Sequence, residues 1–343
     1  MKEIYMFKKL LILGLGVGSF LAHSEVNNRA YSYIGFGIGE LSYKESGTLS
    51  SGLQFETTPT TTNIFNYSGG YTPINKHAGF YINTVSTLSS STTDEYWTAN
   101  GSVTNGNITN SVDGIYQKNA TSSTHNELDI FLGYLIAPGH QIIAGGSYTR
   151  TLMDRNSFDN GSSLDDFNRA HLTPSIGSFD IAGSGAVDVN ENGTLELDEL
   201  IATYGVNPAQ SIVNFTETFT SVVLQAGYIY DSRFATRDLG LRWLGGVIVG
   251  LPAYYDVVNT SNPTLSFSDS FSGFNIKSYI GAGWRFTRSF GVVAKMDYYF
   301  RQRDEVSVDI GFSDELQRSR SAIIPENEIQ YWNASVTAFW NFD

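Results

Sequence analysis

The segment Trp332-Asn-Ala-Ser-Val-Thr-Ala-Phe-Trp-Asn-Phe342 alternates between two kinds of side chain along its length. Its even-numbered positions are apolar and end in Trp340 and Phe342, whereas its odd-numbered positions are mostly polar. Successive side chains of a β-strand point to opposite faces of the sheet, so this period of two predicts a strand with one apolar face. Because aromatic residues stand at both ends of that face, we expect it to contact lipid, with its rings at the two membrane interfaces.

Residues 274–286 and 290–300 repeat this pattern on either side of a tight turn at 287–289. A soluble sandwich also alternates, but its charged face would be the outer one, whereas aromatic residues cap the apolar face here. Further segments alternate less regularly, at 34–38, 65–71, 80–88, 128–136, 141–153, 222–230 and 243–251. Together they give about ten strands, with a range of eight to twelve, on the alternation criterion.

The pattern as a whole predicts an all-β fold, a closed antiparallel transmembrane β-barrel with long extracellular loops. Short turns alternate with long loops rich in Ser, Thr and Asn, as expected for periplasmic turns and extracellular loops. Asn105-Gly106, within a stretch rich in Thr, Val and Ile, predicts a hairpin turn. Its strands either project above the membrane or add a pair to the barrel.

The first residues are typical of an export signal. Lys8 and Lys9 precede an uncharged run over 10–22, which is shorter than a membrane-spanning helix requires. Small residues around Ala22-His23-Ser24 predict cleavage there, so we expect a signal peptide at 1–24 and a barrel domain over 25–343.

The composition narrows the possible partners. A formal net charge of -13 argues against binding nucleic acid, and the absence of cysteine rules out a disulfide framework. No tandem repeat of fixed period is evident, so a solenoid or propeller is not expected.

On the export signal, the alternating strands and the aromatic end Phe339-Trp-Asn-Phe342, the chain resembles bacterial outer-membrane β-barrel proteins. The resemblance covers nearly everything after Glu25 and implies the bacterial outer membrane as location. It also implies membrane lipid and the barrel assembly machinery as partners. Members of this class typically end in an aromatic residue, whereas here Asp343 follows Phe342.

Residues 188–199 (Asp-Val-Asn-Glu-Asn-Gly-Thr-Leu-Glu-Leu-Asp-Glu) match the twelve-residue EF-hand loop position for position. Calcium takes six to eight oxygen ligands, and Gly193 permits the sharp turn that the loop needs. The expected ligands are Asp188, Asn190, Asn192, Thr194 through its carbonyl, Glu196 and Glu199. A helix can follow at 197–204 but none can precede, so the motif resembles a lone dockerin-like calcium loop. The alternative is an acidic turn that matches by chance. We expect calcium to order the 154–210 insertion.

The polar face of the strands carries most of the remaining charge. The residues expected to line the lumen are Arg242, Lys277, Arg285, Lys295, Asp297 and Arg301, with Glu217 and Asp129 as candidate counter-charges. A barrel of about ten strands has a narrow interior. Two hypotheses therefore stay open: a charge network that fills the lumen, or a narrow pore with a basic lining.

Three functions are compatible with these features. The first is porin-like passage of small solutes, or a structural role at the cell surface; the second is a filled barrel that binds a surface ligand. The third is hydrolysis at the barrel mouth, because ten-stranded omptin-like proteases use Asp pairs and an Asp–His couple there. His125, His171 and Asp165-Asp166 are the candidates, but no matching motif surrounds them, so we expect no enzymatic activity.

Overall fold

The computed structural model describes residues 29–177, 188–207, 214–236, 238–260, 266–310 and 320–342. The predicted signal peptide at 1–24 lies outside these residues. Within these ranges the helices are short, namely α2 (Leu164–Leu172), α4 (Leu197–Tyr204), η1 (Thr173–Ser175) and η2 (Ser232–Phe234). No helix in the described ranges has the length and hydropathy needed to cross a membrane.

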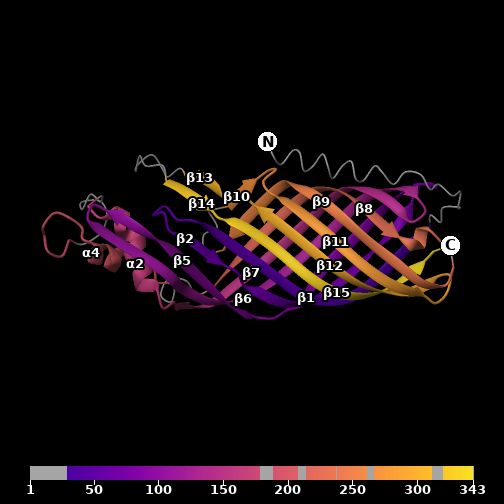
Figure 1. The fold of residues 1–343 in the computed structure, drawn as a ribbon, viewed down its shortest axis with the longest axis horizontal. Coiled ribbons are helices and arrows are strands. Elements are labelled where there is room, and N and C mark those ends of the chain that lie inside the picture. Colours follow the sequence, from indigo (N-terminus) through magenta and orange to yellow (C-terminus); the bar gives the residue numbers. More distant parts are fainter. Residues whose placement is uncertain are drawn as a thin grey trace.

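Ten strands form one closed antiparallel wall (Figure 1). In chain order they are β1 (Tyr31–Thr48), β3 (Thr60–Pro73), β4 (Ala78–Ser90), β6 (Ile108–Ala137), β7 (His140–Asn160), β8 (Asn214–Asp231), β9 (Gly240–Asn259), β11 (Phe274–Arg285), β12 (Phe290–Arg303) and β15 (Glu326–Asn341). Strand β1 pairs with β15 from Tyr31–Asn341 to Ser46–Glu326, which closes the sheet on itself. The predicted antiparallel barrel is confirmed, and its strand number is ten.

The strands are longer than a membrane crossing requires. A tilted transmembrane strand needs about 9–11 residues, whereas β6 has 30 and β7 has 21. The surplus extends beyond one end of the barrel, where β2 (Gln54–Thr57), β5 (Thr93–Asn105) and β10 (Ser266–Asp269) join the sheet and β13 (Val306–Ile310) pairs with β14 (Arg320–Ile324). The hairpin predicted at Asn105-Gly106 is β5–β6, and it projects past the barrel wall (Figure 1).

The part built from β2, β5, the first half of β6, α2 and α4 is called the head below. It has its own apolar core, in which Phe167 of α2 stacks on Tyr116 of β6 with ring centroids 4.1 Å apart. The opposite end carries the short turns, such as Pro138-Gly139 and 287–289, together with Phe342 near the C-terminus, and is called the turn end (Figure 1). The turn pattern predicts that the head is extracellular.

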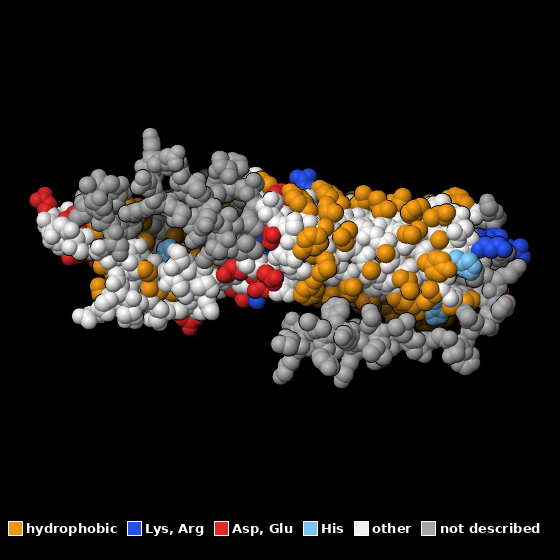
Figure 2. All heavy atoms as spheres, turned by 90° about the horizontal axis from the view of Figure 1, so that it is seen from above, with side chains coloured by type: hydrophobic (Ala, Val, Ile, Leu, Met, Phe, Trp, Pro, Cys, Tyr) orange, Lys and Arg blue, Asp and Glu red, His pale blue; other side chains and the backbone are white. Residues whose placement is uncertain are grey.

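The outer wall between head and turn end is apolar. Ile280, Met296 and Val336 are each more than half exposed, and apolar side chains cover this part of the surface (Figure 2). A water-soluble protein rarely exposes so large an apolar surface, so the wall is suited to lipid. On β1 the exposed apolar residues end at Ile38, and Glu40 follows on the same face.

The interior is packed with side chains in two apolar layers. The turn-end layer consists of Tyr31, Tyr71, Tyr81, Phe131, Leu135, Ile143, Ile229, Phe234 and Ile248. The head-side layer consists of Leu41, Tyr43, Met153, Phe219, Tyr255, Tyr299, Ile329 and Tyr331. Both layers lie across the barrel, because their members come from strands on opposite sides of it.

Replacing Ile280, which is 65% exposed on the outer wall, tests the lipid contact. We expect Ile280→Arg to lower the free energy of unfolding by roughly 2–4 kcal/mol if the residue lies near the membrane midplane. Urea unfolding in lipid vesicles measures this change. The control Thr62→Arg places the same charge on an exposed residue of β3 on the head side of the apolar wall and should fold normally. Equal stability of the two variants would contradict the assignment of the wall to lipid.

Candidate functional site

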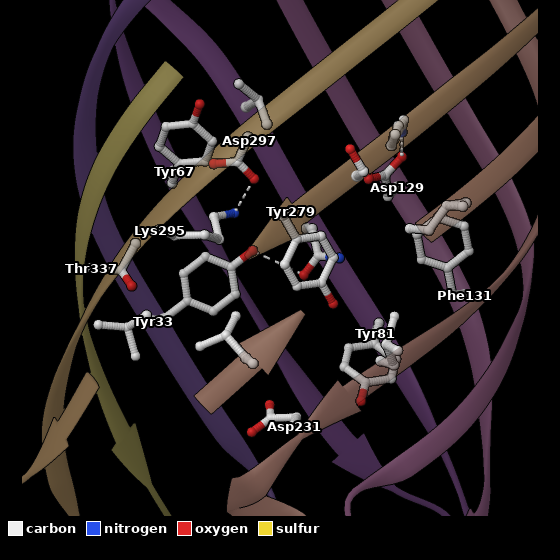
Figure 3. A pocket seen from close by; sticks show the side chains of 18 of the residues that line it. Tyr33, Tyr67, Tyr81, Asp129, Phe131, Asp231, Tyr279, Lys295, Asp297 and Thr337 are labelled. Carbon is white, nitrogen blue, oxygen red and sulfur yellow. Dashed lines mark hydrogen bonds and ion pairs between the residues drawn. The ribbon is translucent and has the colours of Figure 1, made fainter. Parts of the chain in front are cut away.

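A cavity of about 140 Å³ lies inside the barrel between the two layers (Figure 3). Polar side chains point into it from several strands: Tyr33, Tyr67, Tyr81, Glu127, Asp129, Asp231, Arg233, Lys277, Tyr279, Lys295 and Asp297. With roughly 30 Å³ per water molecule, this volume suits a few waters.

The charges around the cavity are paired. Lys277 Nζ donates to Glu127 Oε1 at 2.7 Å and to Asp129 Oδ1 at 2.6 Å, which joins β11 to β6 across the lumen. Lys295 Nζ lies 2.7 Å from Asp297 Oδ1. Buried charges are costly unless they are paired, so these contacts are what permits a charged interior.

Arg155, at the head side of β7, has three carboxylate partners. Its Nε lies 2.9 Å from Glu95 Oε2, its Nη1 2.6 Å from Glu217 Oε2 and its Nη2 3.5 Å from Glu45 Oε2. This cluster, called the mouth cluster below, ties β7 to β5, β8 and β1. Arg155 is 2% exposed, so its guanidinium and the carboxylates around it are shielded from solvent where the wall meets the head.

The mouth cluster lies outside the apolar wall. Glu45 is seven residues beyond Ile38 on β1, on the head side, and its Oε2 accepts a hydrogen bond from the Tyr43 hydroxyl at 2.9 Å. Burial and then the nearby Glu217 carboxylate raise the pKa of Glu45 to about 8, although Arg155 acts in the opposite direction. Three carboxylates share one cation, and Glu45 is the one whose raised pKa favours the protonated form.

The structure places the predicted lumen residues inside the barrel. Arg242, Lys277, Arg285 and Arg301 are at most 8% exposed. The candidate counter-charge Asp129 pairs with Lys277, and Glu217 pairs with Arg155 rather than with one of the predicted cations.

Several interior residues were absent from the predicted lumen lining, namely Arg155, Glu45, Glu95, Glu127 and His125. The odd-numbered positions of β6 continue inward past Asp129 through Glu127 and His125, and those of β7 continue through Met153 to Arg155. Following the same alternation further along each strand would have found His125, Glu127 and Arg155.

The histidines considered for hydrolysis are separated. His125 is fully buried in the lumen, where its Nδ1 lies 2.9 Å from Thr151 Oγ1. His171 belongs to α2 in the head, with Nδ1 3.1 Å from Ser51 Oγ, and burial lowers its pKa. Asp165 and Asp166 are exposed in the first turn of α2.

The segment 188–199 folds as a turn that leads into α4. Asp188 Oδ2 accepts from the Gly193 amide at 2.7 Å, and Gly193 has a φ of 81°. Glu199 accepts from the amides of Val189 and Glu196 at 2.7 and 2.9 Å, and Leu195 is buried against α2 and α4. Among the described residues no three His, Cys, Asp or Glu side chains come together as metal ligands. Calcium binding therefore stays a prediction.

A closed antiparallel wall with an apolar outer face and a packed interior defines a transmembrane β-barrel of the outer-membrane type. No family model and no curated protein matches the chain. Among solved structures it is similar to the outer membrane protease OmpT from Escherichia coli, at 9% identity and a TM-score of 0.54, over 94% of this chain and 99% of that one.

Two further structures match less well. A FadL homologue from Pseudomonas aeruginosa has 7% identity and a TM-score of 0.32, over 92% of this chain and 91% of that one. The outer membrane protein OprG from the same organism has 8% identity and a TM-score of 0.30, over 93% and 98%. At such identities the likeness to OmpT concerns the fold alone.

The raised pKa of Glu45 predicts a pH dependence. The native state binds more protons than the unfolded state between about pH 4.5 and 8, so the stability due to Glu45 falls as pH rises through this range. In urea unfolding between pH 6 and pH 9, Glu45→Gln should lose less stability than the wild type. Glu56→Gln, on the exposed pair with Lys44, should behave like the wild type. Identical pH profiles for Glu45→Gln and wild type would contradict this role.

Proposed function

We propose that the chain is a surface-binding outer-membrane barrel with a filled lumen, which neither conducts solutes nor catalyses a reaction. The observation that carries the proposal is the closure of the lumen. Two apolar layers and the mouth cluster cross the lumen, and the cavity between the layers has a volume of only about 140 Å³. Passage of a solute would require these packed side chains to move apart.

The head supports a binding role. Long strands carry it beyond the apolar wall, and it has a separate core of β-strands and helix α2. Polar side chains are exposed along β5 of the head, among them Asn100, Ser102 and Thr104. A rigid barrel that holds a folded module in the aqueous phase is suited to presenting that module to a partner.

The lack of catalysis is part of the same proposal. His125 lies in the lumen and His171 in the head, so the two histidines belong to different parts of the molecule. The buried carboxylates nearest the mouth form their ion pairs with Arg155 rather than with a histidine.

Single-channel conductance in planar bilayers tests the closed lumen. We expect the refolded wild-type chain to be silent. A variant with Tyr71→Ala, Phe234→Ala, Tyr299→Ala and Tyr331→Ala removes rings from both layers and should conduct. Steady, ion-selective openings by the wild type would overturn the proposal in favour of porin-like passage.

Deleting the head insertion tests the binding role. Asn156 and Asn214 are register partners, so a short Gly-Ser linker can replace residues 161–213 without parting β7 from β8. The shortened barrel should still assemble, and cells that display it should attach less well to surfaces than cells displaying the full chain. Unchanged attachment would count against the head as the binding element.

We further propose that residues 188–199 bind calcium and order the insertion. The all-oxygen donor set suits a hard cation, and Gly193 already adopts the left-handed turn that the motif needs. The carboxylates of Asp188 and Glu199 now hold backbone amides, so calcium would have to draw them together.

Proteolysis tests calcium binding. Asp188→Ala with Glu199→Ala should make the insertion cleavable in calcium, as chelation should in the wild type. Asp166→Ala removes an exposed acid outside the loop and should stay protected in calcium. Equal protection of wild type and double variant would remove the calcium assignment.

A further inference from the structure

Arg301 on β12 is a buried cation with no acidic partner among the described residues. It is 1% exposed, and its Nη1 donates to the neutral Thr149 Oγ1 at 3.2 Å. The ring of Tyr255 lies 5.2 Å from its guanidinium carbon. Its Nε and Nη2 donate to nothing in the part of the chain that the structure describes. A desolvated charge is ordinarily paired, so Arg301 is an exception.

Arg301 ends a row of facing residues on consecutive strands. Gln225 of β8 pairs with Gly250 of β9, Gly250 pairs with Asn275 of β11, and Asn275 pairs with Arg301. Gln225 and Asn275 are 4% and 1% exposed. Neither amide group makes a hydrogen bond of normal geometry among the described residues. Four strands thus bring three unsatisfied polar side chains to one place in the lumen.

Gly250 makes room for this arrangement. A Cβ atom there would lie 2.8 Å from Gln225 Cγ and would also collide with Asn275 Oδ1. Because Gly250 has no side chain, the side chains of Gln225 and Asn275 can both occupy the space beside β9. Glu127 and Asp129 of the cavity form their ion pairs with Lys277, and among the described residues no carboxylate forms a salt bridge with Arg301.

We propose that Gln225, Asn275 and Arg301 form an internal binding site for a small carboxylate. With Nη1 used by Thr149, the free Nε and Nη2 form the edge of the guanidinium that presents two parallel N–H groups. This edge matches the two oxygens of a carboxylate, which forms short, charge-assisted bonds with arginine. The amide nitrogens of Gln225 and Asn275 add neutral donors. The rings of Tyr255 and Tyr299 belong to the buried layer around this row, so we expect the site to take only a ligand as small as formate or acetate.

The closed lumen determines how the site is tested. The full chain is refolded with sodium formate or with sodium chloride at equal ionic strength, so that the anion is present before the layers pack. A ligand that binds only the native state raises the unfolding temperature. We expect the wild type to unfold at a higher temperature in formate than in chloride. Equal unfolding temperatures in the two salts would overturn the proposal.

Variants separate the site from general salt effects. Arg301→Met keeps much of the aliphatic stem but removes the charge, so its unfolding temperature should be the same in both salts. Arg150→Met changes an exposed arginine on β7 and should keep the full formate effect. Should Arg301→Met fail to fold, Gln225→Leu retains the cation and should reduce the formate effect. A full formate effect in Arg301→Met or in Gln225→Leu would overturn the proposal.

Discussion

The pairing of β1 with β15 is the constraint on which the rest of the structure depends. In a lipid layer no water is available to satisfy backbone amides and carbonyls, so a sheet can cross only if it has no free edge. The ladder from Tyr31–Asn341 to Ser46–Glu326 removes both edges at once. Within the membrane, every strand side chain must then point either to lipid or into the lumen, which accounts for the alternation of the membrane-spanning segments.

Closure with ten strands also determines the interior. The space is too wide to leave empty and too narrow for a water-filled channel beside side chains of this size. Tyrosines and aliphatic residues fill it in two layers, and between them charged groups are accommodated as cross-lumen pairs such as Lys277 with Glu127 and Asp129. The same packing that stabilises the barrel is what supports the proposal of a filled lumen with a binding role for the head.

The fold could be predicted from the sequence because a sustained two-residue period is compatible with a strand and not with a helix. The clearest strands, 274–286, 290–300 and 332–342, correspond to β11, β12 and β15. Strands β6 and β7 are longer than the alternation predicts, because the residues before 128 in β6 and after 153 in β7 are mostly polar.

The pairing of charges could not be predicted, because it depends on register and shear rather than on spacing along one strand. Nothing in the sequence near Arg155 reveals that Glu45, Glu95 and Glu217 surround it. Likewise, Gln225 and Asn275 are ordinary polar residues of the lumen until the pairing with Gly250 places them in one row.

The continuity of β6 has a mechanical consequence. This strand runs without interruption from the turn at Asn105-Gly106 in the head to Ala137 at the turn end. A force on the tip of the head would act along β6. The hydrogen bonds that pair β6 with β7 would then be loaded in shear, many of them at the same time. The head is thus joined to the barrel by a long hydrogen-bonded ladder rather than by a hinge, so a force on its tip is spread over many bonds.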